Sequence, residues 1–288
     1  MKLLVTGGSG FLGSELALQA RAAGWEVVAT HRSRPVGAGS AGVATVPLDV
    51  TDATAIEALL TRERPDCVVN TAYVLSGPDL QAITAEAPGH VARACLRHGA
   101  RLIQLSSDLV FDGRPGGRSG SHGGYTEADP ALPIIPYGEA KAAAEAELAA
   151  LDPGALVVRT SLLLDSSLGL GPQETRPLAA ARGELELGFF SDEWRTPLSV
   201  RDLAAALLEA APRADLSGLL HIAGPDRLNR LELAQLVCLR HGADPAGLRG
   251  ALAAALAGPR PLDASLDSSR AAGLLATRIR GIREVLAA

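Results

Sequence analysis

The segment Thr6-Gly7-Gly8-Ser9-Gly10-Phe11-Leu12-Gly13, written TGGSGFLG, decides the fold of this 288-residue chain. It follows an apolar run that predicts a strand over Lys2–Thr6, and it opens a predicted helix over Phe11–Ala23. A glycine-rich turn between a strand and a helix binds the pyrophosphate of a dinucleotide, because the helix start offers free N–H groups and a positive dipole. The residues of this turn that we expect at the cofactor are Gly7, Gly10, Phe11, Leu12 and Gly13.

Predicted strands and helices alternate through the first half of the sequence. The strands are near-continuous apolar runs, as expected where helices cover both faces of a sheet. We therefore predict an α/β fold, a doubly wound parallel sheet of the Rossmann type, with ligands beyond the carboxyl ends of its strands. Further strands are predicted over Glu26–Thr30, Val43–Leu48, Asp66–Ala72, Arg101–Ser106 and Leu156–Thr160. Further helices are predicted over Ala53–Arg62, Leu80–His98 and Tyr137–Leu151.

The end of the second strand indicates which dinucleotide binds. NAD sites place an acid there for the ribose 2′-hydroxyl, whereas NADP sites place a basic group for the 2′-phosphate. The sequence at this point is Thr30-His31-Arg32-Ser33-Arg34, which contains no acid. We predict NADP(H), with Arg32 at the phosphate and Ser33 or His31 beside it. The alternative is a solvated basic loop.

Asp49-Val50 follows the third predicted strand. The carboxylate of Asp49 can accept a hydrogen bond from the exocyclic amine of adenine. It can equally cap the helix over Ala53–Arg62, a role for which its neighbours are also suited. Val50 and Ala72, which ends the next predicted strand, complete the expected cofactor residues.

After Thr160 the regular alternation of predicted strands and helices is lost. We predict that residues 1–160 form the NADP-binding Rossmann domain and that residues 161–288 form mostly a smaller substrate-binding lobe, partly interleaved with it. The elements that return to the sheet are predicted over Val200–Ala211 (helix) and Leu219–Ala223 (strand). The remaining helices are predicted over Arg230–His241, Ala246–Leu256 and Ile279–Leu286.

Tyr137 and Lys141 are the main candidates for chemistry. The chain contains only two lysines and three tyrosines, so a Tyr and a Lys four residues apart are rarely a coincidence. Residues i and i+4 lie on one helix face, one turn apart. An ammonium beside a phenol favours the phenolate, so this pair predicts a proton donor with a lowered pKa.

Composition excludes several other classes of protein. A net charge of −5 argues against a nucleic-acid binder. The sequence has no apolar run long enough for a membrane span, and its first residues read as strand and turn, not as a signal peptide. We expect a cytoplasmic protein with no metal, in which Cys67, Cys95 and Cys238 are buried free thiols.

A series of motifs resembles the extended short-chain dehydrogenase/reductases, and among them the dTDP-4-dehydrorhamnose reductase group. The match runs over nearly the whole chain, and its more specific parts are SSDxVFDG and RTPLSVRDLA. The segments that carry it are TGGSGFLG (6–13), SSDLVFDG (106–113), YTEADP (125–130), PYGEAKAAAE (136–145), VVRTSLLL (157–164), DEWRTPLSVRDLA (192–204) and RPLDASLD (260–267).

The resemblance implies three catalytic positions. Ser107 matches the residue that hydrogen-bonds the substrate carbonyl, and Tyr137 matches the general acid. Lys141 matches the lysine that holds the nicotinamide ribose and lowers the pKa of the tyrosine. Donors aimed at the ketone oxygen stabilise the negative charge that develops there during hydride transfer. Without the resemblance, Ser107 reads as an ordinary cap or turn hydroxyl.

The chain also departs from the reductase pattern. The family motif DQxGxPT is here Asp192-Glu193-Trp194-Arg195-Thr196-Pro197-Leu198, with Arg195 in place of a glycine. Gly113–Gly124 lengthens a loop that is usually short, either as a lid or as a disordered insertion. The candidates for substrate contact are Asp108 and, at the substrate pyrophosphate, Arg195 and Arg260. The alternative for each arginine is an exposed side chain.

We therefore expect an NADPH-dependent reductase of a nucleotide-linked 4-keto-6-deoxy sugar. Asp108-Leu109 follows Ser107 where 4,6-dehydratases carry an Asp-Glu pair, which argues against a dehydratase. Two alternatives stay open: a sugar-nucleotide epimerase, and a non-catalytic NADP-binding regulatory subunit. The oligomeric state also stays open, with a homodimer among the possibilities.

Overall fold

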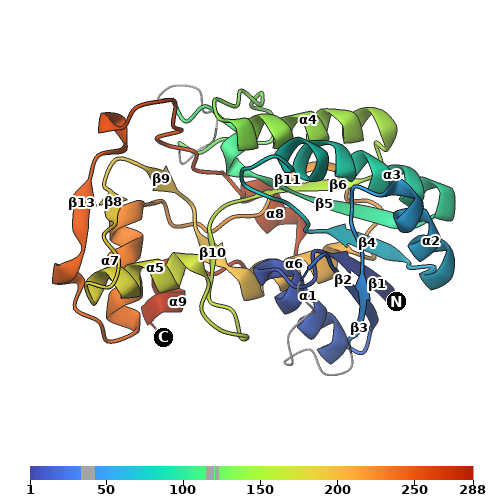
Figure 1. Ribbon diagram of the computed structural model, residues 1–288, viewed down its shortest axis with the longest axis horizontal. Coiled ribbons are helices and arrows are strands. Elements are labelled where there is room, and N and C mark those ends of the chain that lie inside the picture. Colours follow the sequence, from blue (N-terminus) through green and yellow to red (C-terminus); the bar gives the residue numbers. More distant parts are fainter. Residues whose placement is uncertain (34–42, 115–119, 121–122, 288) are drawn as a thin grey trace.

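The computed structural model describes residues 1–33, 43–114, 120 and 123–287. A sheet of seven parallel strands lies at its centre, in the order β11-β6-β5-β4-β1-β2-β3 (Figure 1). Its strands are β1 (Lys2–Thr6), β2 (Glu26–His31), β3 (Ala44–Pro47), β4 (Cys67–Asn70), β5 (Arg101–Ser107), β6 (Leu156–Thr160) and β11 (Gly218–His221). The chain runs outward from β1 in both directions, so the switch point lies between β1 and β4. This confirms the predicted doubly wound sheet.

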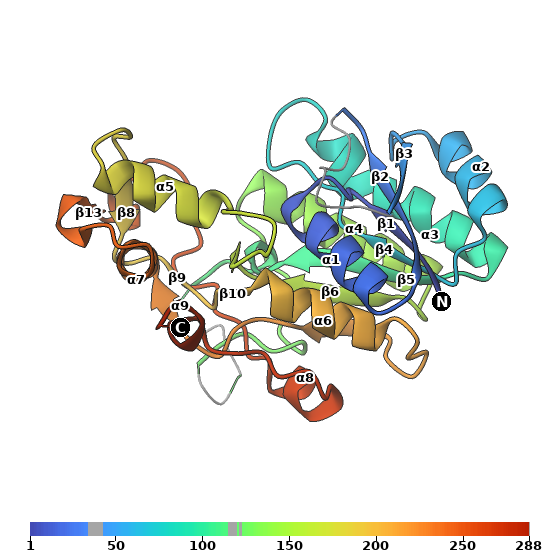
Figure 2. The ribbon, with the colours of Figure 1, turned by 90° about the horizontal axis from the view of Figure 1, so that it is seen from below.

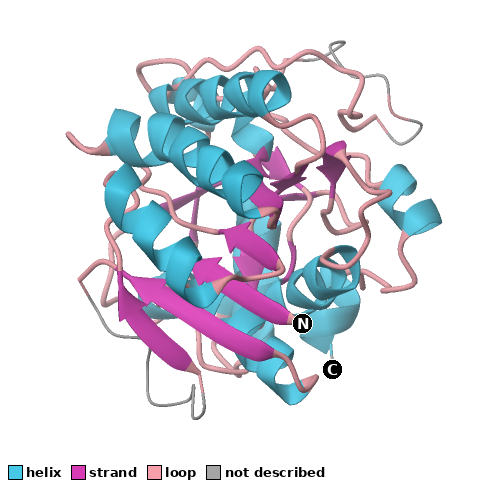
Figure 3. Ribbon diagram, turned by 90° about the vertical axis from the view of Figure 1, so that its right-hand side faces the viewer, coloured by secondary structure: helices cyan, strands magenta, loops and turns pink. Residues whose placement is uncertain are grey.

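Helices cover both faces of the sheet (Figure 3). One layer consists of α1 (Phe11–Ala22) and α6 (Val200–Ala210). The other consists of α2 (Ala53–Glu63), α3 (Ala87–His98) and α4 (Pro136–Leu151). A π-helical segment, Gln81–Glu86, directly precedes α3. Each face has its own apolar core: Leu3 and Val5 of β1 point into one and Leu4 into the other. The reason is that successive side chains of a strand point to opposite faces of the sheet.

The lobe lies beside one end of the sheet in both Figure 1 and Figure 2. Its helices are α5 (Pro172–Ala181), α7 (Arg230–Arg240) and α9 (Ile282–Ala287), while α8 (Ser269–Leu274) contacts β11. Its paired short strands are β7 (Leu163–Leu164) with β10 (Leu198–Ser199), β8 (Gly188–Phe190) with β13 (Arg249–Ala251), and β9 (Trp194–Arg195) with β12 (Leu228–Asn229). Residues Leu178, Leu233 and Ile282 join α5, α7 and α9 in one buried cluster. As expected, α6 and β11 belong with the sheet, and the division of the chain at residue 160 stays a proposal.

The predicted helix over Ala246–Leu256 is wrong. This segment forms two 3-10 turns, Pro245–Gly247 and Ala253–Ala255, with β13 between them. The alanines favour a helix, but Gly247 and Gly250 weaken it, and pairing with β8 supplies the backbone hydrogen bonds instead. The carboxylate of Asp192 accepts from the N–H groups of Ala253 and Ala254, at 2.6 and 3.0 Å, and ends the strand.

Cys67, Cys95 and Cys238 are free and buried, which confirms the expectation of buried thiols. In the described part of the chain, no helix is both long enough and apolar enough to cross a membrane. The same residues contain no group of three His, Cys, Asp or Glu side chains placed to hold a metal ion.

Candidate active site

The turn between β1 and α1 leaves no room for a Cβ at three of its glycines, Gly7, Gly8 and Gly13. Gly7 has φ +69°, a conformation that glycine adopts without strain. A Cβ at Gly13 would lie 2.4 Å from the carbonyl oxygen of Gly7, so only glycine lets α1 approach the turn this closely. Among the described residues, the same oxygen, at 3.1 Å, is the only atom near a Cβ placed at Gly10, so they leave the space beyond Gly10 open.

A cavity lies over this turn at the carboxyl ends of the strands, and we call it the glycine-turn cavity. It is lined by Gly7, Ser9, Gly10, Thr30, Arg32, Ser33, Leu48, Val50, Thr71, Ala72, Tyr73, Val74 and Ile83. Of the predicted cofactor residues outside the reaction centre, the lining contains Gly7, Gly10, Arg32, Ser33, Val50 and Ala72. Open glycine backbone at one end and a guanidinium at the other fit a dinucleotide that carries a further phosphate.

The other predicted cofactor residues lie behind or beside this lining. Leu12 is buried in the core, and the ring of Phe11 lies against Gly171. Gly13 lets α1 pack closely against the glycine turn and so positions the start of the helix. Nδ1 of His31 is buried without a hydrogen-bond partner among the described residues.

Arg32 reaches across the mouth of the cavity. Its Nη1 lies 3.0 Å from Oδ2 of Asp79, and both side chains are about half exposed, which makes this a weak and exchangeable ion pair. Asp79 lies further along the chain after β4 and was not among the predicted cofactor residues. Arg34, also in the predicted basic segment, lies outside the described residues.

Asp49 does not cap α2. Its carboxylate accepts from the N–H and the hydroxyl of Thr51, at 2.9 and 2.8 Å, and these bonds lower its pKa. The cap is Asp52, which accepts from the N–H groups of Thr54 and Ala55. Asp49 is exposed beside the cavity, so contact with adenine is the surviving interpretation.

Tyr137 and Lys141 come from α4, and Ser107 from the end of β5. Nζ of Lys141 donates to the carbonyl oxygen of Leu105 at 2.9 Å and lies 5.9 Å from the ring centroid of Tyr137. The ring of Tyr73, exposed in the glycine-turn cavity, lies 5.9 Å from that of Tyr137. The structure therefore brings the three predicted catalytic residues together beside the cavity.

Ser107 has the local role that its sequence context also suggested. Its Oγ accepts from the N–H of Leu109 at 3.2 Å and so caps the short turn Asp108–Val110. Its hydroxyl donates to Oδ1 of Asp108 at 3.0 Å. The cap holds the serine oxygen at a defined place at the end of β5.

The predicted lowering of the Tyr137 pKa is wrong for this structure. Burial raises the pKa of Tyr137, as do Tyr73 and Asp108, while a hydrogen bond with Ser107 opposes the rise. Burial also lowers the pKa of Lys141 to about 8, because the ammonium is fully enclosed and Glu145 compensates only in part. The phenol is therefore protonated at neutral pH, as a proton donor must be.

A buried ion pair between Glu145 and Arg159 lies next to the predicted catalytic residues on α4. The carboxylate of Glu145 accepts from Arg159 at 2.6 to 3.2 Å and from the hydroxyl of Ser106 at 2.5 Å. We did not predict this pair, although Tyr137, Lys141 and Glu145 share the four-residue spacing of one helix face.

Two predicted substrate residues are buried and engaged within the protein. Asp108 is 3% exposed, and Arg195 is 4% exposed. Arg195 donates to the carbonyl oxygens of Trp194 and Pro261, at 2.7 and 3.0 Å. The exposed alternative for Arg195 is therefore wrong, because the whole side chain is buried. Contact of Asp108 and Arg195 with the substrate stays a prediction.

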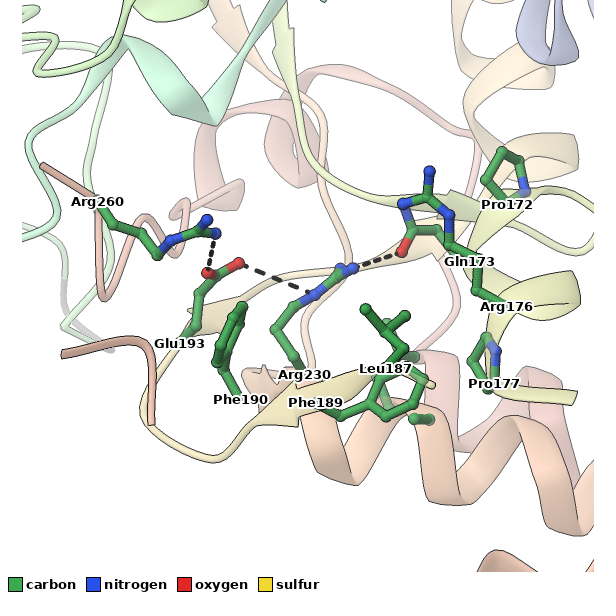
Figure 4. A pocket seen from close by; sticks show the side chains of 13 residues that line it. Pro172, Gln173, Arg176, Pro177, Leu187, Phe189, Phe190, Glu193, Arg230 and Arg260 are labelled. Atoms are coloured by element: carbon green, nitrogen blue, oxygen red, sulfur yellow. Dashed lines mark hydrogen bonds and ion pairs between the residues drawn. The ribbon is translucent and has the colours of Figure 1, made fainter. Parts of the chain in front are cut away.

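The lobe contains a second cavity, which we call the lobe pocket (Figure 4). It is lined by Pro172, Gln173, Arg176, Pro177, Leu187, Gly188, Phe189, Phe190, Glu193, Arg230, Leu233, Ala234 and Arg260. Arg260 pairs with Glu193 at 3.0 Å, and its guanidinium lies 5.0 Å from the ring centroid of Phe190. The predicted contact residue Arg260 thus lines a pocket with aromatic and cationic groups.

Arg230 is the residue of this pocket that the sequence analysis missed. Its Nη2 donates to the side chain of Gln173 at 2.8 Å, and its Nε lies 3.8 Å from Glu193. Nη1 is buried and has no hydrogen-bond partner among the described residues. An unpaired buried donor is costly, so this nitrogen suits an anionic ligand. Nothing in the sequence distinguishes Arg230 from the other arginines.

Comparison with known proteins agrees with this geometry. The family model described as the RmlD substrate binding domain matches residues 1–288. The chain belongs to the dTDP-4-dehydrorhamnose reductase family. It is 34% identical over 268 residues to dTDP-4-dehydrorhamnose reductase of Mycobacterium tuberculosis, which covers 90% of this chain and 82% of that protein. It is also 34% identical over 292 residues to the Streptomyces griseus protein of the same name, covering 94% and 88%.

Solved structures of the reductase family share the architecture. The crystal structure of a hypothetical dTDP-4-dehydrorhamnose reductase from Sulfolobus tokodaii superimposes with a TM-score of 0.79 at 29% identity, covering 97% of each chain. This confirms the family resemblance that the sequence motifs predicted. The segment Gly113–Gly124 was expected to lengthen a loop, as a lid or as a disordered insertion; its residues 115–119 and 121–122 lie outside the described residues.

Proposed function

We propose that this reductase family member reduces the 4-keto group of a nucleotide-linked 6-deoxy sugar with NADPH. The observation that carries the proposal is the convergence of Ser107, Tyr137 and Lys141 at the edge of the glycine-turn cavity. Proteins named dTDP-4-dehydrorhamnose reductase are relatives over most of the chain, which supports the same chemistry.

The glycine-turn cavity would hold the cofactor. Gly7 and Gly10 admit the pyrophosphate, Val50 and Ala72 offer apolar walls, and Arg32 offers its guanidinium to the 2′-phosphate. Bound NADPH supplies the hydride that the ketone carbon accepts.

Tyr137 supplies the proton. Its raised pKa keeps the hydroxyl protonated until negative charge develops on the ketone oxygen, which then takes that proton to give the alcohol. Ser107 orients the same oxygen through its hydroxyl, held in place by the cap to Leu109. The ammonium of Lys141, enclosed under both rings, favours the phenolate that remains and is placed to hold the nicotinamide ribose.

The nucleotide portion of the substrate would occupy the lobe pocket. Arg230 and Arg260 offer guanidinium groups to a diphosphate, and Phe189 and Phe190 offer flat apolar surface to a base. The unpaired Nη1 of Arg230 supports this placement. We also propose that the protein acts in the cytoplasm and forms a homodimer, to be tested by cell fractionation and by sedimentation velocity.

The first experiment is NADPH oxidation by the purified protein with dTDP-4-keto-6-deoxyglucose, with and without its C3/C5-epimerised form. We expect rapid oxidation with one of the two ketones, and the preferred form defines the substrate. Tight NADPH binding without oxidation of either ketone would contradict the proposal. Isomerised sugar without net oxidation would then indicate an epimerase, and co-purification with a partner enzyme would indicate a regulatory subunit.

A further inference from the structure

Arg195 is a buried arginine where the family motif has glycine. It lies in β9 of the lobe, and its side chain is 4% exposed. Nη1 and Nη2 donate to the backbone oxygens of Trp194 and Pro261. These two bonds attach the guanidinium rigidly to the lobe.

The same guanidinium faces two carboxylates from different parts of the fold. Nε lies 3.7 Å from Oδ2 of Asp108, which follows β5 of the sheet. Nη2 lies 3.4 Å from Oε1 of Glu193, which belongs to the lobe. Glu193 also pairs with Arg230 and Arg260 (Figure 4). Alternating charges therefore connect the lobe pocket, through Arg195, with Asp108 at the end of β5.

Asp108 connects this series of charges to the proposed catalytic serine. Oδ1 accepts from the hydroxyl of Ser107 at 3.0 Å, and Oδ2 accepts from the hydroxyl of Ser161 at 2.7 Å. A carboxylate that is 3% exposed needs a compensating cation to stay ionised. Arg195 is the cation that opposes the effect of burial on Asp108 most strongly.

We propose that Arg195 is a positioning residue that acts through Asp108: its nearby charge favours the ionised carboxylate, and the ionised form orients the hydroxyl of Ser107. A carboxylate only accepts hydrogen bonds, so Ser107 must donate to it. A protonated Asp108 could instead donate to Ser107, which would leave the serine hydroxyl with two orientations. The inference rests on the proposed function, in which this hydroxyl turns from Asp108 to the ketone oxygen when the substrate binds, because Ser107 has a single hydrogen to donate.

The ionisation of Asp108 depends on all the charged and titratable groups that face it. They are Arg195, Glu193, Arg230 and Tyr137. Burial, the largest cause, raises the pKa of Asp108 above its ordinary value, as does Glu193, and the charge of Arg195 opposes that rise. Removing the charge of Arg195 therefore raises that pKa, and the variant regains the carboxylate only at higher pH.

The test is the pH profile of kcat for Arg195→Met and for Arg195→Gln, which keeps hydrogen-bond donors but no charge. In both variants we expect the acid limb of the profile to move to higher pH by at least about one pH unit. At a fixed pH on that limb, kcat should therefore be about tenfold lower than in the wild type. NADPH affinity should stay at the wild-type value, and Arg195→Lys should restore most of the profile. The matched control is Arg227→Met, which removes an arginine that pairs with Asp263 at 2.7 Å on the same lobe. Its profile should be that of the wild type.

A double-mutant cycle separates action through Asp108 from a general structural effect. In the Asp108→Asn background, Arg195→Met should cause little further loss and no shift of the profile. A full additional loss in that background would overturn the proposal. So would a wild-type profile in both single variants of Arg195.

A measurement without substrate distinguishes failure of this inference from failure of the proposed function. Carbon-13 NMR of the aspartate carboxyl groups, with Asp108 assigned by its absence in Asp108→Asn, reports its titration directly. We expect a higher pKa in Arg195→Gln than in the wild type. Equal values would overturn the inference even in an active enzyme, whereas a wild-type protein that oxidises no NADPH contradicts only the proposed function.

Discussion

The glycine-turn cavity and the lobe pocket present opposite solutions to the binding of an anion. In the first, the proposed pyrophosphate site is the backbone of one short segment, the glycine turn, in which Gly7 and Gly13 leave no room for a Cβ. The second is built from side chains of distant segments, among them Arg230 and Arg260, and Glu193 holds both arginines in place. Substitutions in the first should therefore act through shape, and substitutions in the second through charge.

The strongest test removes the proposed proton donor beside the glycine-turn cavity. Tyr137→Phe should lower kcat by about 10²- to 10⁴-fold, the usual contribution of a general acid, while NADPH binds as before. Tyr125→Phe, which removes a hydroxyl that donates to Asp112 at 2.7 Å, serves as the control. Near-normal turnover by Tyr137→Phe would exclude the mechanism.

A steric test of the glycine turn is Gly13→Ala. The new Cβ would collide with the carbonyl oxygen of Gly7, so we expect a loss of about 1–3 kcal/mol in the free energy of unfolding, with weaker NADPH binding. Gly273→Ala is the matched control, because no residue of the described chain outside its own helix turn comes within 4 Å of its Cβ position. Chemical denaturation of both variants measures the difference, and equal stabilities would contradict the close approach.

A charge test of the lobe pocket is Arg230→Met. Loss of a charged donor to the diphosphate should raise KM for the sugar nucleotide by about tenfold or more and leave the Kd of NADPH unchanged. Arg182→Met removes an exposed arginine of the same lobe that pairs with Glu184, and it should change neither constant. If KM stays at the wild-type value in Arg230→Met, the nucleotide binds elsewhere.

A smaller effect is expected for Arg32→Ala in the glycine-turn cavity. The guanidinium already has an exposed partner in Asp79, so its loss should weaken NADPH binding by roughly tenfold and NADH binding much less. Fluorescence titration with both cofactors gives the ratio, with Arg62→Ala as the control at another exposed arginine. An equal loss for both cofactors would refute recognition of the 2′-phosphate by Arg32.

The smallest effect concerns the pH dependence of stability. Burial lowers the pKa of Lys141 from 10.5 to about 8, so between these values the unfolded chain holds a proton that the folded chain has released. Stability from this group therefore rises with pH, by about 1 kcal/mol between pH 7 and 9. Denaturation of the wild type and of Lys141→Met at both pH values isolates the contribution, and an identical pH dependence would show that Lys141 is not perturbed.

Prediction from the sequence succeeded where one segment carries its own geometry. The glycine turn, the Tyr137–Lys141 pair and the parallel strands depend on local spacing and on period-two or helical patterns, so they were predictable. The helix expected over Ala246–Leu256 was wrong because pairing with β8 outweighed the helix propensity of alanine. Asp49 did not cap α2, because a neighbouring carboxylate took the same role.

The sequence by itself determined the class of fold, the order of the sheet-forming elements, the family and the residues of the proposed reaction centre. Only the tertiary structure decided the surroundings of those residues. It buried Arg195 against Asp108 and assembled the lobe pocket around Arg230. It also raised the pKa of Tyr137 where spacing alone suggested the opposite. The physical reason is that burial and the charge of distant neighbours set the ionisation and availability of a side chain, and neither is encoded in local spacing.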